Sequence, residues 1–302
     1  MMNRKRACVI GCGKIGALYD LEKSDLILTH AKGYYLSDKT ELMLVIDKDK
    51  LAAKKVGNKY NCNYGTDYTN LDFNEIDILS ICVPTEFHFE ILEYLYRIGY
   101  ENLIILEKPV VNTDEEIKKI NDFDSEFLDN IYINYIRSYD KQYRKVFLDI
   151  KNKKYSVVKL IQVSYFGEFE HNAVHALNLI NNLFQLKPIV KYKDQHLVIL
   201  DYAGVDVVFC QLMTEYANYD IVINTNTHKI IFDSLGYKLK IYESINSKKF
   251  TNINEINLEY EADVLNYYIL NLIDIVFDKS EYKPTFYDGM KDQKLIKEIK
   301  RC

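Results

Sequence analysis

The stretch that decides the fold is Val9-Ile10-Gly11-Cys12-Gly13-Lys14-Ile15-Gly16, where an apolar run enters a glycine turn. Its glycines follow the G-x-G-x-x-G spacing that begins a dinucleotide-binding βαβ unit. The first glycine permits a tight turn, the second lets the backbone approach a pyrophosphate, and the third allows a helix to pack closely on a strand. We therefore expect Gly11, Gly13, Lys14, Ile15 and Gly16 to bind a dinucleotide at the N-terminus of a helix.

Asp47 directly follows the next apolar run, residues 42–46. A carboxylate at this strand end accepts hydrogen bonds from the adenosine ribose hydroxyls, which favours NAD over NADP. The spacing from Gly16 to Asp47 exceeds the usual ~20 residues, and we interpret residues 21–29 as an insertion that accounts for the difference. Two alternatives stay open: Asp47 is a solvated strand-end carboxylate, or Lys48 and Lys50 accommodate the 2′-phosphate of NADP.

Residues 5–134 alternate short apolar runs with helical patterns, which is typical of βαβ units on a parallel sheet. We expect strands at 7–10, 42–46, 78–83, 103–106 and 131–134. Helical spacing covers 86–96 and 113–123, and the second of these begins with a Thr-x-x-Glu capping box. Because βαβ crossovers are right-handed, residues 1–134 are predicted to form a domain with a doubly wound parallel sheet.

After residue 134 the pattern changes. A helix is expected at 141–151, a strand at 157–165 and a helix at 172–183. Strands follow at 197–201, 205–212, 221–224, 229–232 and 239–242, and helices follow at 260–277 and 288–300. Strands in succession indicate an antiparallel sheet. Residues 135–302 are therefore predicted to form a second α/β domain with an open, largely antiparallel sheet, closely joined to the first.

The composition narrows the classes of partner. A net charge of -5 and a pI near 5.8 give no basic footprint for nucleic acid, so a small molecule is the expected ligand. The apolar runs are shorter than the ~18 residues that span a bilayer, and Arg4-Lys5-Arg6 leads into a strand instead of a signal-peptide core. Six cysteines show neither a CxxC pair nor zinc spacing, which favours a reducing, cytoplasmic location.

A second informative segment is Glu107-Lys108-Pro109, which follows the apolar run at 103–106. Open α/β sheets bind ligands at the carboxyl ends of their strands. A partly desolvated Lys108 beside the cofactor is therefore a candidate to hydrogen-bond a substrate oxygen and help move its proton. The alternative is a lysine whose stem covers apolar surface while its ammonium lies in water.

The loop after the strand at 78–83 is expected on the nicotinamide side of the same edge. Pro84 stops the hydrogen bonding of that strand and exposes the following loop, which contains Thr85. His88 follows in the next helical turn. It is either a cofactor-binding residue or a surface residue of the helix.

The segment His171-Asn172-Ala173-Val174-His175-Ala176-Leu177-Asn178 carries the remaining candidates. At helical spacing, His171, His175, Asn178 and Asn182 share one face. Histidine and asparagine suit hydroxyl recognition and proton transfer near neutral pH, whereas a solvated face usually carries Lys and Glu. Histidines four residues apart also match a metal-ligand spacing, but neither HExxH nor an obvious third ligand accompanies them, so we predict no metal.

Taken in order, residues 11–16, residues 82–85 with His88, Glu107-Lys108-Pro109 and residues 167–178 resemble the glucose–fructose oxidoreductase, inositol dehydrogenase and rhizopine-catabolism (Gfo/Idh/MocA) family. The resemblance covers residues 5–185 and the two-domain pattern. It implies a Rossmann domain and a C-terminal α/β domain whose open sheet often forms a dimer contact. It also implies NAD(P)-linked oxidation or reduction of a sugar, inositol or sugar-nucleotide carbon.

By position, the resemblance makes Lys108 the catalytic lysine and His175 the catalytic histidine, with Glu107 beside the cofactor. The family usually has one aspartate four residues before that histidine and another three residues after it. This chain has His171 and Asn178 at those places. We expect His171 to replace the first carboxylate in the proton relay, or the relay to take another route, and Asn178 to contact substrate.

Three further residues match a region at the end of the Rossmann sheet that often borders substrate in the family. They are Asn134, Tyr135 and Arg137, and we expect Tyr135 and Arg137 to contact substrate. Arg137 either holds a carboxylate or phosphate of the substrate or pairs with an acidic neighbour.

These expectations combine into a predicted function. The chain is expected to be an NAD(P)-dependent dehydrogenase or reductase acting on a CH-OH carbon of a polyhydroxylated small molecule, and to form a homodimer or homotetramer through its C-terminal sheet. In the reductive direction His175 would donate the proton, Lys108 would stabilise the alkoxide, and His171 would orient His175. The alternatives are a catalytically silent NAD(P)-binding regulator and an oxidoreductase for a non-sugar substrate such as an imine or tetrapyrrole.

Overall fold

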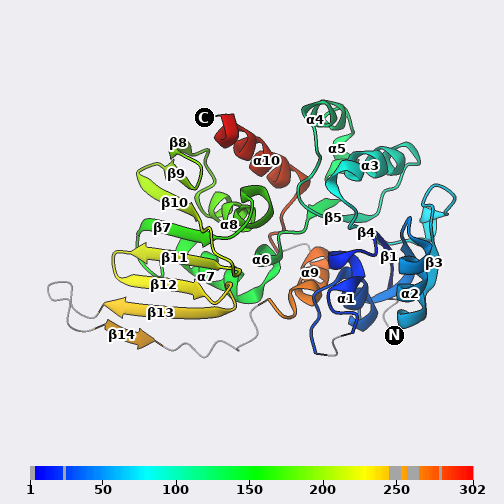
Figure 1. Cartoon of the computed structure of the whole chain (residues 1–302), viewed down its shortest axis with the longest axis horizontal. Coiled ribbons are helices and arrows are strands. Elements are labelled where there is room, and N and C mark those ends of the chain that lie inside the picture. Colours follow the sequence, from blue (N-terminus) through cyan, green and yellow to red (C-terminus); the bar gives the residue numbers. More distant parts are fainter. Residues whose placement is uncertain (1–3, 23–24, 245–252, 257–264, 279–280, 302) are drawn as a thin grey trace. The chain divides into compact units, whose positions relative to one another are not determined.

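The computed structural model describes residues 4–22, 25–244, 253–256, 265–278 and 281–301. The chain divides into two units (Figure 1): Met1–Tyr139 with Asn266–Met290 form unit 1, and Asp140–Leu265 with Lys291–Cys302 form unit 2. The predicted division lay at residue 134. In the structure it falls after Tyr139, and the segment 266–290, which we had assigned to the second domain, belongs to unit 1.

Unit 1 is built on a parallel sheet with the strand order β3-β2-β1-β4-β5-β6 among the described residues. The strands are β1 (Lys5–Ile10), β2 (Thr40–Ile46), β3 (Asn63–Gly65), β4 (Ile78–Ile81), β5 (Leu103–Leu106) and β6 (Ile131–Ile133). The order reverses between β1 and β4, and open α/β sheets bind ligands at the carboxyl ends of the strands at such a reversal.

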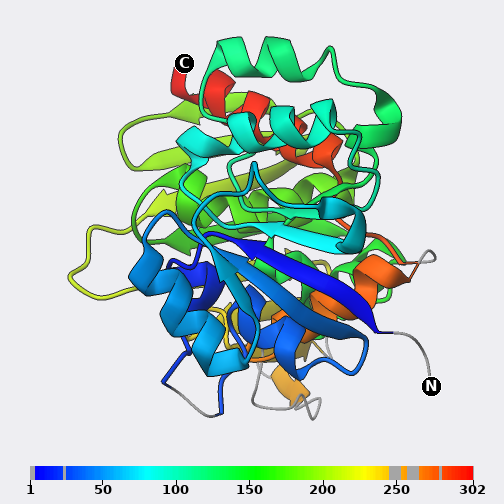
Figure 2. The ribbon, with the colours of Figure 1, turned by 90° about the vertical axis from the view of Figure 1, so that its right-hand side faces the viewer.

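Helices cover both faces of this sheet (Figures 1 and 2). On one side lie α3 (His88–Arg97), α4 (Asp114–Ile120) and α5 (Ser125–Leu128); on the other lie α1 (His30–Leu36), α2 (Lys50–Tyr60) and α9 (Tyr268–Phe277). The unit also contains the short turns η1 (Lys14–Leu18), η2 (Phe73–Glu75) and η3 (Thr85–Phe87), and the short helix α6 (Ile136–Tyr139). The predicted doubly wound fold is confirmed, as is the capping box of Thr113 and Glu116 at the start of α4.

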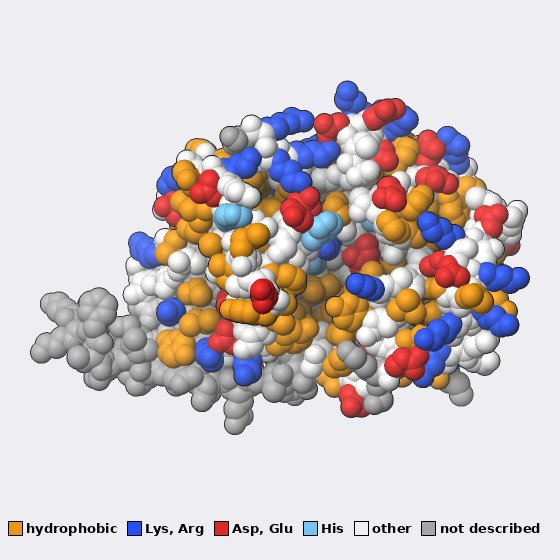
Figure 3. Space-filling view, viewed as in Figure 1, with side chains coloured by type: hydrophobic (Ala, Val, Ile, Leu, Met, Phe, Trp, Pro, Cys, Tyr) orange, Lys and Arg blue, Asp and Glu red, His pale blue; other side chains and the backbone are white. Residues whose placement is uncertain are grey.

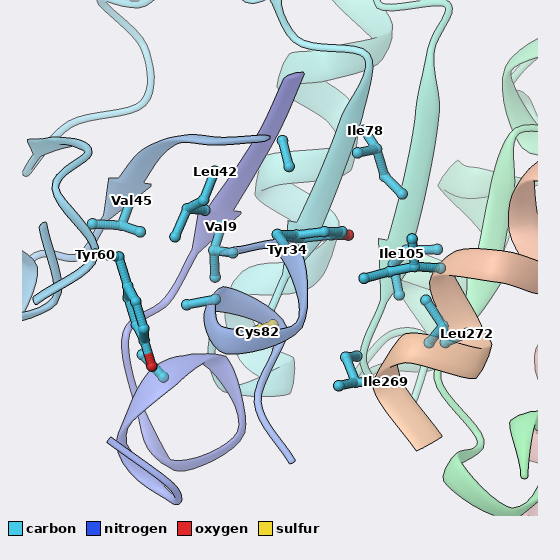
Figure 4. Packing of buried hydrophobic residues seen from close by; sticks show 14 of the residues in the cluster. Val9, Tyr34, Leu42, Val45, Tyr60, Ile78, Cys82, Ile105, Ile269 and Leu272 are labelled. Atoms are coloured by element: carbon cyan, nitrogen blue, oxygen red, sulfur yellow. The ribbon is translucent and has the colours of Figure 1, made fainter. Parts of the chain in front are cut away.

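The core on the α9 side shows why the segment 266–290 belongs to unit 1. Tyr34 of α1 and Ile105 of β5 are fully buried, and Ile269 and Leu272 of α9 pack into the same cluster (Figure 4). A Cβ on Gly33 would lie 2.8 Å from Ile269 Cγ1, so this glycine lets α1 and α9 approach closely. Burying an aliphatic side chain of this size contributes about 2 kcal/mol, so α9 is an integral part of the core.

The chain between the glycine turn and α1 explains the long spacing to Asp47. Where we expected one helix, the structure has the five-residue π-helical turn η1, a connecting segment, and then α1. The buried Asp20 carboxylate closes this segment: it accepts hydrogen bonds from Leu28 N–H at 2.5 Å, from Thr29 N–H at 3.0 Å and from the Thr29 hydroxyl at 2.7 Å. Thr29 then caps α1 by accepting the Lys32 N–H.

Unit 2 carries a largely antiparallel sheet with the order β14-β13-β12-β11-β7-β10-β9-β8 among the described residues, in which β7 and β10 pair in parallel. The strands are β7 (Val158–Tyr165), β8 (Ile189–Lys193), β9 (Leu197–Tyr202), β10 (Val205–Gln211), β11 (Tyr219–Thr225), β12 (His228–Asp233), β13 (Lys238–Ser244) and β14 (Ile253–Ile256). The predicted open, largely antiparallel sheet is confirmed.

Helices α7 (Lys141–Lys151) and α8 (Val174–Phe184) pack on the buried face of this sheet. Tyr143 of α7 stacks on Phe232 of β12 with ring centroids 4.0 Å apart, and Phe184 of α8 stacks on Tyr202 of β9 at 4.9 Å. A last helix, α10 (Phe286–Arg301), begins in unit 1 and ends in unit 2. Of the helix predicted at 260–277, residues 260–264 lie outside the described residues, and α9 begins at Tyr268.

The described surface shows no segregation of charge on the face in Figure 3, where acidic, basic and apolar side chains are interspersed. Within the described ranges, the helices are too short or too polar to cross a membrane.

Candidate active site

The glycine turn joins β1 to η1 and lies against the end of β4. Gly11 has a φ of +100°, and a Cβ there would lie 2.6 Å from the carbonyl carbon of Cys82. A Cβ on Gly16 would overlap the carbonyl oxygen of Gly11, whereas a Cβ on Gly13 would meet no described atom within 4 Å. Packing therefore requires the first and third glycines, and the second leaves open space beside the turn. That is where a pyrophosphate approaches the backbone, so the turn fits a dinucleotide.

Asp47 lies at the end of β2, beside the same turn. One of its carboxylate oxygens accepts the Cys12 N–H at 2.7 Å, and the other accepts the Asp49 N–H at 2.8 Å. Each carboxylate oxygen has two lone pairs, so the group keeps acceptor capacity for ribose hydroxyls. The neighbouring Lys48 ammonium lies 5.0 Å from the centroid of the Phe87 ring. A fixed carboxylate thus lies where the sequence predicts a ribose contact.

The end of β4 lies beside the glycine turn, because Cys82 N–H donates to the Ile10 carbonyl at 2.7 Å. Pro84 then precedes the turn η3, which begins at Thr85. Both residues therefore follow the strand that adjoins β1 at the reversal of strand order. Their contact with the nicotinamide stays a prediction.

His88 begins α3 and is 1% exposed, so it is not a surface residue of the helix. Nε2 lies 2.9 Å from the carbonyl oxygen of Val83, and Nδ1 lies 2.9 Å from that of Pro109. His88 therefore links the loop after β4 to the loop after β5. Burial lowers the pKa of His88, although these carbonyl groups and the charge of Glu107 act in the opposite direction. Its contact with the cofactor stays a prediction.

The carboxylate of Glu107, the residue after β5, belongs to a buried network of hydrogen bonds. Asn134 Nδ2 donates to Glu107 Oε1 at 2.6 Å, and His30 Nε2 lies 3.2 Å from the same oxygen. His30 Nδ1 lies 2.8 Å from Ser80 Oγ, which lies 2.7 Å from the Tyr34 hydroxyl. His30, Ser80, Tyr34 and Asn134 have no solvent-exposed surface. Burial alone would raise the pKa of Glu107, but the hydrogen bonds and charges around it, those of His30 first, hold that pKa below its ordinary value.

Lys108 follows Glu107 at the carboxyl end of β5 and is half-buried. Its peptide bond to Pro109 is cis. The charge of Lys108 is one of those that lower the pKa of Glu107. Lys108 therefore lies between two anchored neighbours: Glu107 in the buried network and Pro109, whose carbonyl contacts His88.

Tyr135 and Arg137 follow β6 at the same edge of the sheet. Both are buried, and Arg137 belongs to the short helix α6. The preceding residue, Asn134, is the one that donates to Glu107. The substrate contacts of Tyr135 and Arg137 stay predictions.

In unit 2, the polar face predicted at 171–182 is interrupted. Phe169–Ala173 form a π-helical turn, η4, and α8 begins only at Val174. His171 is exposed on this turn, whereas His175 on α8 is 6% exposed. The neighbouring Glu170 carboxylate pairs with Lys300 at 2.6 Å. Burial would raise the pKa of Glu170, but Lys300 and, more weakly, His171 lower it.

Further along α8, two asparagines hold a buried carboxylate. Asn178 Nδ2 donates to Asp292 Oδ2 at 2.8 Å, and Asn181 Nδ2 donates to Asp292 Oδ1 at 2.7 Å. The Tyr202 hydroxyl donates to Asn181 Oδ1 at 2.6 Å. A carboxylate therefore does lie beside position 178, but α10 supplies it. The substrate contact of Asn178 stays a prediction, and its amide already binds Asp292.

Cysteine chemistry and metal binding find little support among the described residues. Burial raises the pKa of Cys12 to about 12, that of Cys62 to about 11, and that of Cys82 well above its usual value. Neutral thiols are poor nucleophiles. No described group of three or more His, Cys, Asp or Glu side chains is placed to hold a metal ion.

The structure brings separate predicted segments to one edge of one sheet. These residues are Gly11, Gly13, Lys14, Ile15, Gly16, Asp47, Pro84, Thr85, His88, Glu107, Lys108, Tyr135 and Arg137. The other three candidates, His171, His175 and Asn178, lie in unit 2. Sequence reasoning missed His30 and Ser80. The available signal for His30 was Thr29, a helix-capping residue directly before it.

The sheet, the glycine turn and the strand-end residues define a dinucleotide-binding protein of the Rossmann class. Residues 5–125 match the model of the oxidoreductase family with an NAD-binding Rossmann fold, GFO_IDH_MocA. The match lies within unit 1, and over these residues the chain is similar to the NAD-binding Rossmann part of that oxidoreductase family. The resemblance predicted from the sequence is confirmed, and so is NAD or NADP as the cofactor.

Relatives agree with this assignment. The chain is 23% identical to inositol 2-dehydrogenase of Rhizobium meliloti (strain 1021) over 156 residues, which are 52% of this chain and 43% of that protein, so the match spans less than half of the relative. An oxidoreductase from Agrobacterium radiobacter in complex with NAD+, L-tartaric acid and magnesium superposes with a TM-score of 0.69 at 14% identity, covering 96% of this chain and 93% of that one. KijD10, a 3-ketoreductase from Actinomadura kijaniata in complex with NADP, superposes with a TM-score of 0.71 at 12% identity, covering 96% and 95%. At these identities the structures establish the fold.

Proposed function

We propose that this chain is an NAD(P)-dependent oxidoreductase that transfers hydride between the nicotinamide and a carbonyl or hydroxyl carbon of a polyhydroxylated small molecule. One observation carries the proposal: the glycine turn after β1 and Lys108 after β5 lie at the same carboxyl edge, on either side of β4. The turn fits the pyrophosphate, and the lysine supplies a cation where a reacting oxygen would need one.

Residues 11–16 would hold the pyrophosphate, and Asp47 would accept the adenosine ribose hydroxyls. When bound, the nicotinamide supplies or accepts the hydride. The two backbone N–H groups that fix the Asp47 carboxylate support a preference for NAD, because a 2′-phosphate would meet this negative charge.

The reaction itself needs a proton to move as the hydride moves. In the reductive direction, Lys108 would stabilise the developing alkoxide and His175 would donate the proton to it, with His171 orienting His175. In the oxidative direction the same groups would remove the hydroxyl proton. The half-buried position of Lys108 supports this role, since desolvation strengthens its attraction for an alkoxide.

The substrate class rests on the relatives. An inositol 2-dehydrogenase matches the sequence, and a 3-ketoreductase matches the fold. Both names describe chemistry at a CH-OH or ketone carbon, so inositols, sugars and sugar nucleotides are the first substrates to examine. Imines and tetrapyrroles are the non-sugar alternatives.

The test is turnover of NADH and NADPH, followed by nicotinamide fluorescence, with a panel of inositols, ketosugars and sugar nucleotides. We expect Lys108→Ala to bind the cofactor with unchanged affinity and to lose about 100-fold or more in kcat. Lys54→Ala, an exposed lysine on α2, is the matched control. Near-wild-type turnover by Lys108→Ala would overturn the role of Lys108. Cofactor binding without turnover of any substrate would instead support a regulatory protein.

We also propose a homo-oligomer formed through the sheet of unit 2. Along β7, β10 and β11, alternate residues such as Val163, Phe209 and Ile223 are buried, while the opposite face presents half-buried Leu160 and Val208. Analytical ultracentrifugation tests this, and Val208→Glu is expected to shift the oligomer toward the monomer. A cytoplasmic location is proposed on the thiols of the described cysteines, which form no disulfide among the described residues.

A further inference from the structure

The network around Glu107 exceeds what is needed to fix a strand end. The sheet already holds the backbone there, because Glu107 N–H donates to the Ile81 carbonyl at 3.1 Å. Nevertheless, side chains from α1 and from the end of β6 contact the carboxylate, and a side chain from β4 contacts the one from α1. Burying such polar groups costs several kcal/mol unless each is hydrogen-bonded, so their arrangement calls for a function.

The partners define the direction of these hydrogen bonds. An ionised Glu107 only accepts, so His30 Nε2 must carry the hydrogen that faces it. In the tautomer whose one ring hydrogen is on Nε2, Nδ1 accepts from the Ser80 hydroxyl, and Ser80 Oγ accepts from the Tyr34 hydroxyl. Every O–H and N–H in this series has an acceptor. The donors run from Tyr34 through Ser80 and His30 to a single oxygen of Glu107.

The other side of Lys108 is anchored independently. His88 lies 2.9 Å from the carbonyl oxygen of Pro109 and 3.2 Å from that of Val110. The backbone after the lysine is therefore held by α3. On the preceding side, His30 holds the negatively charged carboxylate of Glu107 in place.

We propose that His30 is a positioning residue for Lys108: through the series of donors it fixes the Glu107 carboxylate in its ionised form, and this carboxylate orients the Lys108 ammonium for the reaction. The inference rests on the proposed function, in which Lys108 stabilises the substrate oxygen. A carboxylate that receives two N–H donors keeps its charge despite burial. A fixed charge next to a flexible four-carbon side chain reduces the positions that its ammonium occupies.

The test compares His30→Leu, which removes both ring nitrogens, with His30→Gln, which restores one donor and one acceptor. Tyr100→Phe is the control, because the buried Tyr100 hydroxyl donates to the Ile76 carbonyl at 3.2 Å and lies outside the series. Each variant is measured for kcat, for the KM of the substrate, for NADH affinity and for thermal midpoint. The ionisation of Glu107 is followed separately by carbon-13 NMR of its carboxyl group, assigned with Glu107→Gln.

We expect His30→Leu to lose about 10-fold or more in kcat with NADH affinity unchanged, because displacement of a catalytic group by about 1 Å is that costly. The NMR titration of Glu107 should move to higher pH, since burial is then opposed by one donor fewer. His30→Gln should recover most of both changes. Tyr100→Phe should lower the thermal midpoint alone.

The proposal is overturned if the Glu107 titration in His30→Leu equals that of the wild type, or if kcat falls no further than in Tyr100→Phe. Should His30→Leu not fold, Ser80→Ala takes its place, with a smaller shift expected in the same direction. Absence of turnover by the wild type would refute the proposed function. The NMR titration would still decide in that case whether His30 fixes the carboxylate.

Discussion

The two regions that carry the candidate catalytic residues differ in what their buried histidine and asparagine side chains hold in place. In unit 1, His30 and His88 are buried, and they hold the residues on either side of Lys108. In unit 2, Asn178, on the predicted functional face of α8, holds α10 through Asp292. Polar side chains at helical spacing therefore do not by themselves mark a binding face, and histidines on helix termini can be structural parts of a reactive edge.

Asp292→Ala tests the structural role of the asparagines in unit 2, and it has the largest expected effect on stability. It removes the acceptor that the buried Asn178 and Asn181 amides share, and each such loss costs about 1–3 kcal/mol. We expect the free energy of unfolding, measured by urea denaturation, to fall by about 3 kcal/mol. Glu298→Ala removes the exposed ion pair with Lys187 and should cost less than about 1 kcal/mol. Equal losses in the two variants would contradict the importance of Asp292.

Gly13→Ala tests the cofactor site of unit 1, because it is expected to change cofactor binding without changing the stability of the fold. A Cβ at this position meets no described atom within 4 Å, so the fold should keep its thermal midpoint. The methyl group would occupy the space that a pyrophosphate needs, and we expect the dissociation constant of NADH to rise about 10-fold, or about 1.4 kcal/mol. Gly65→Ala is the matched control, since its Cβ also meets no described atom. Unchanged NADH affinity in Gly13→Ala would show that the cofactor does not pass over the turn.

His88→Gln gives the smallest effect, seen as a change in pH dependence. Burial lowers the pKa of His88 in the folded state below its ordinary value of about 6.5. The unfolded chain then binds the proton more readily, so the stability present above that value is lost as the pH falls toward the folded pKa. The slope is at most about 1.4 kcal/mol per pH unit for one group. Urea denaturation between about pH 7 and about pH 5 should give a flatter pH dependence of the free energy of unfolding for His88→Gln than for the wild type.

The elements that the sequence predicted well are those with local causes. The strand at 103–106 has four successive apolar residues between polar neighbours, and β5 has the predicted bounds. The helix at 141–151 also has the predicted bounds, because Asp140 caps it by accepting the Gln142 and Tyr143 N–H groups. In contrast, the prediction missed β8 (Ile189–Lys193). Its residues are exposed or half-buried, so no buried face imposes the alternation of apolar and polar residues that indicates a strand.

The residues of the candidate site also fall into two groups: those in a local motif, which the sequence predicts, and those held by contacts with distant parts of the chain. The glycine turn is a local motif, and its spacing alone predicts its shape. The anchors of Glu107 and Pro109 depend on partners far away in the chain: His30 contacts Ser80 across 50 residues, and His88 contacts Pro109 across 21. A single sequence contains no pattern for such contacts, so both histidines could be placed only once the sheet was known.

The position of α9 bears on the order in which the protein acquires its structure during synthesis. The six-stranded parallel sheet of the described residues leaves the ribosome early, but Ile269 and Leu272, which cover its face beside Tyr34 and Ile105, are translated near the end. Domains generally fold as units in the order of their synthesis. Here the nascent first unit keeps an apolar face uncovered while residues 140–265 of unit 2 are being made. The newly made chain therefore exposes this face until α9 is translated, and a chaperone that binds apolar surface would protect it in the interval.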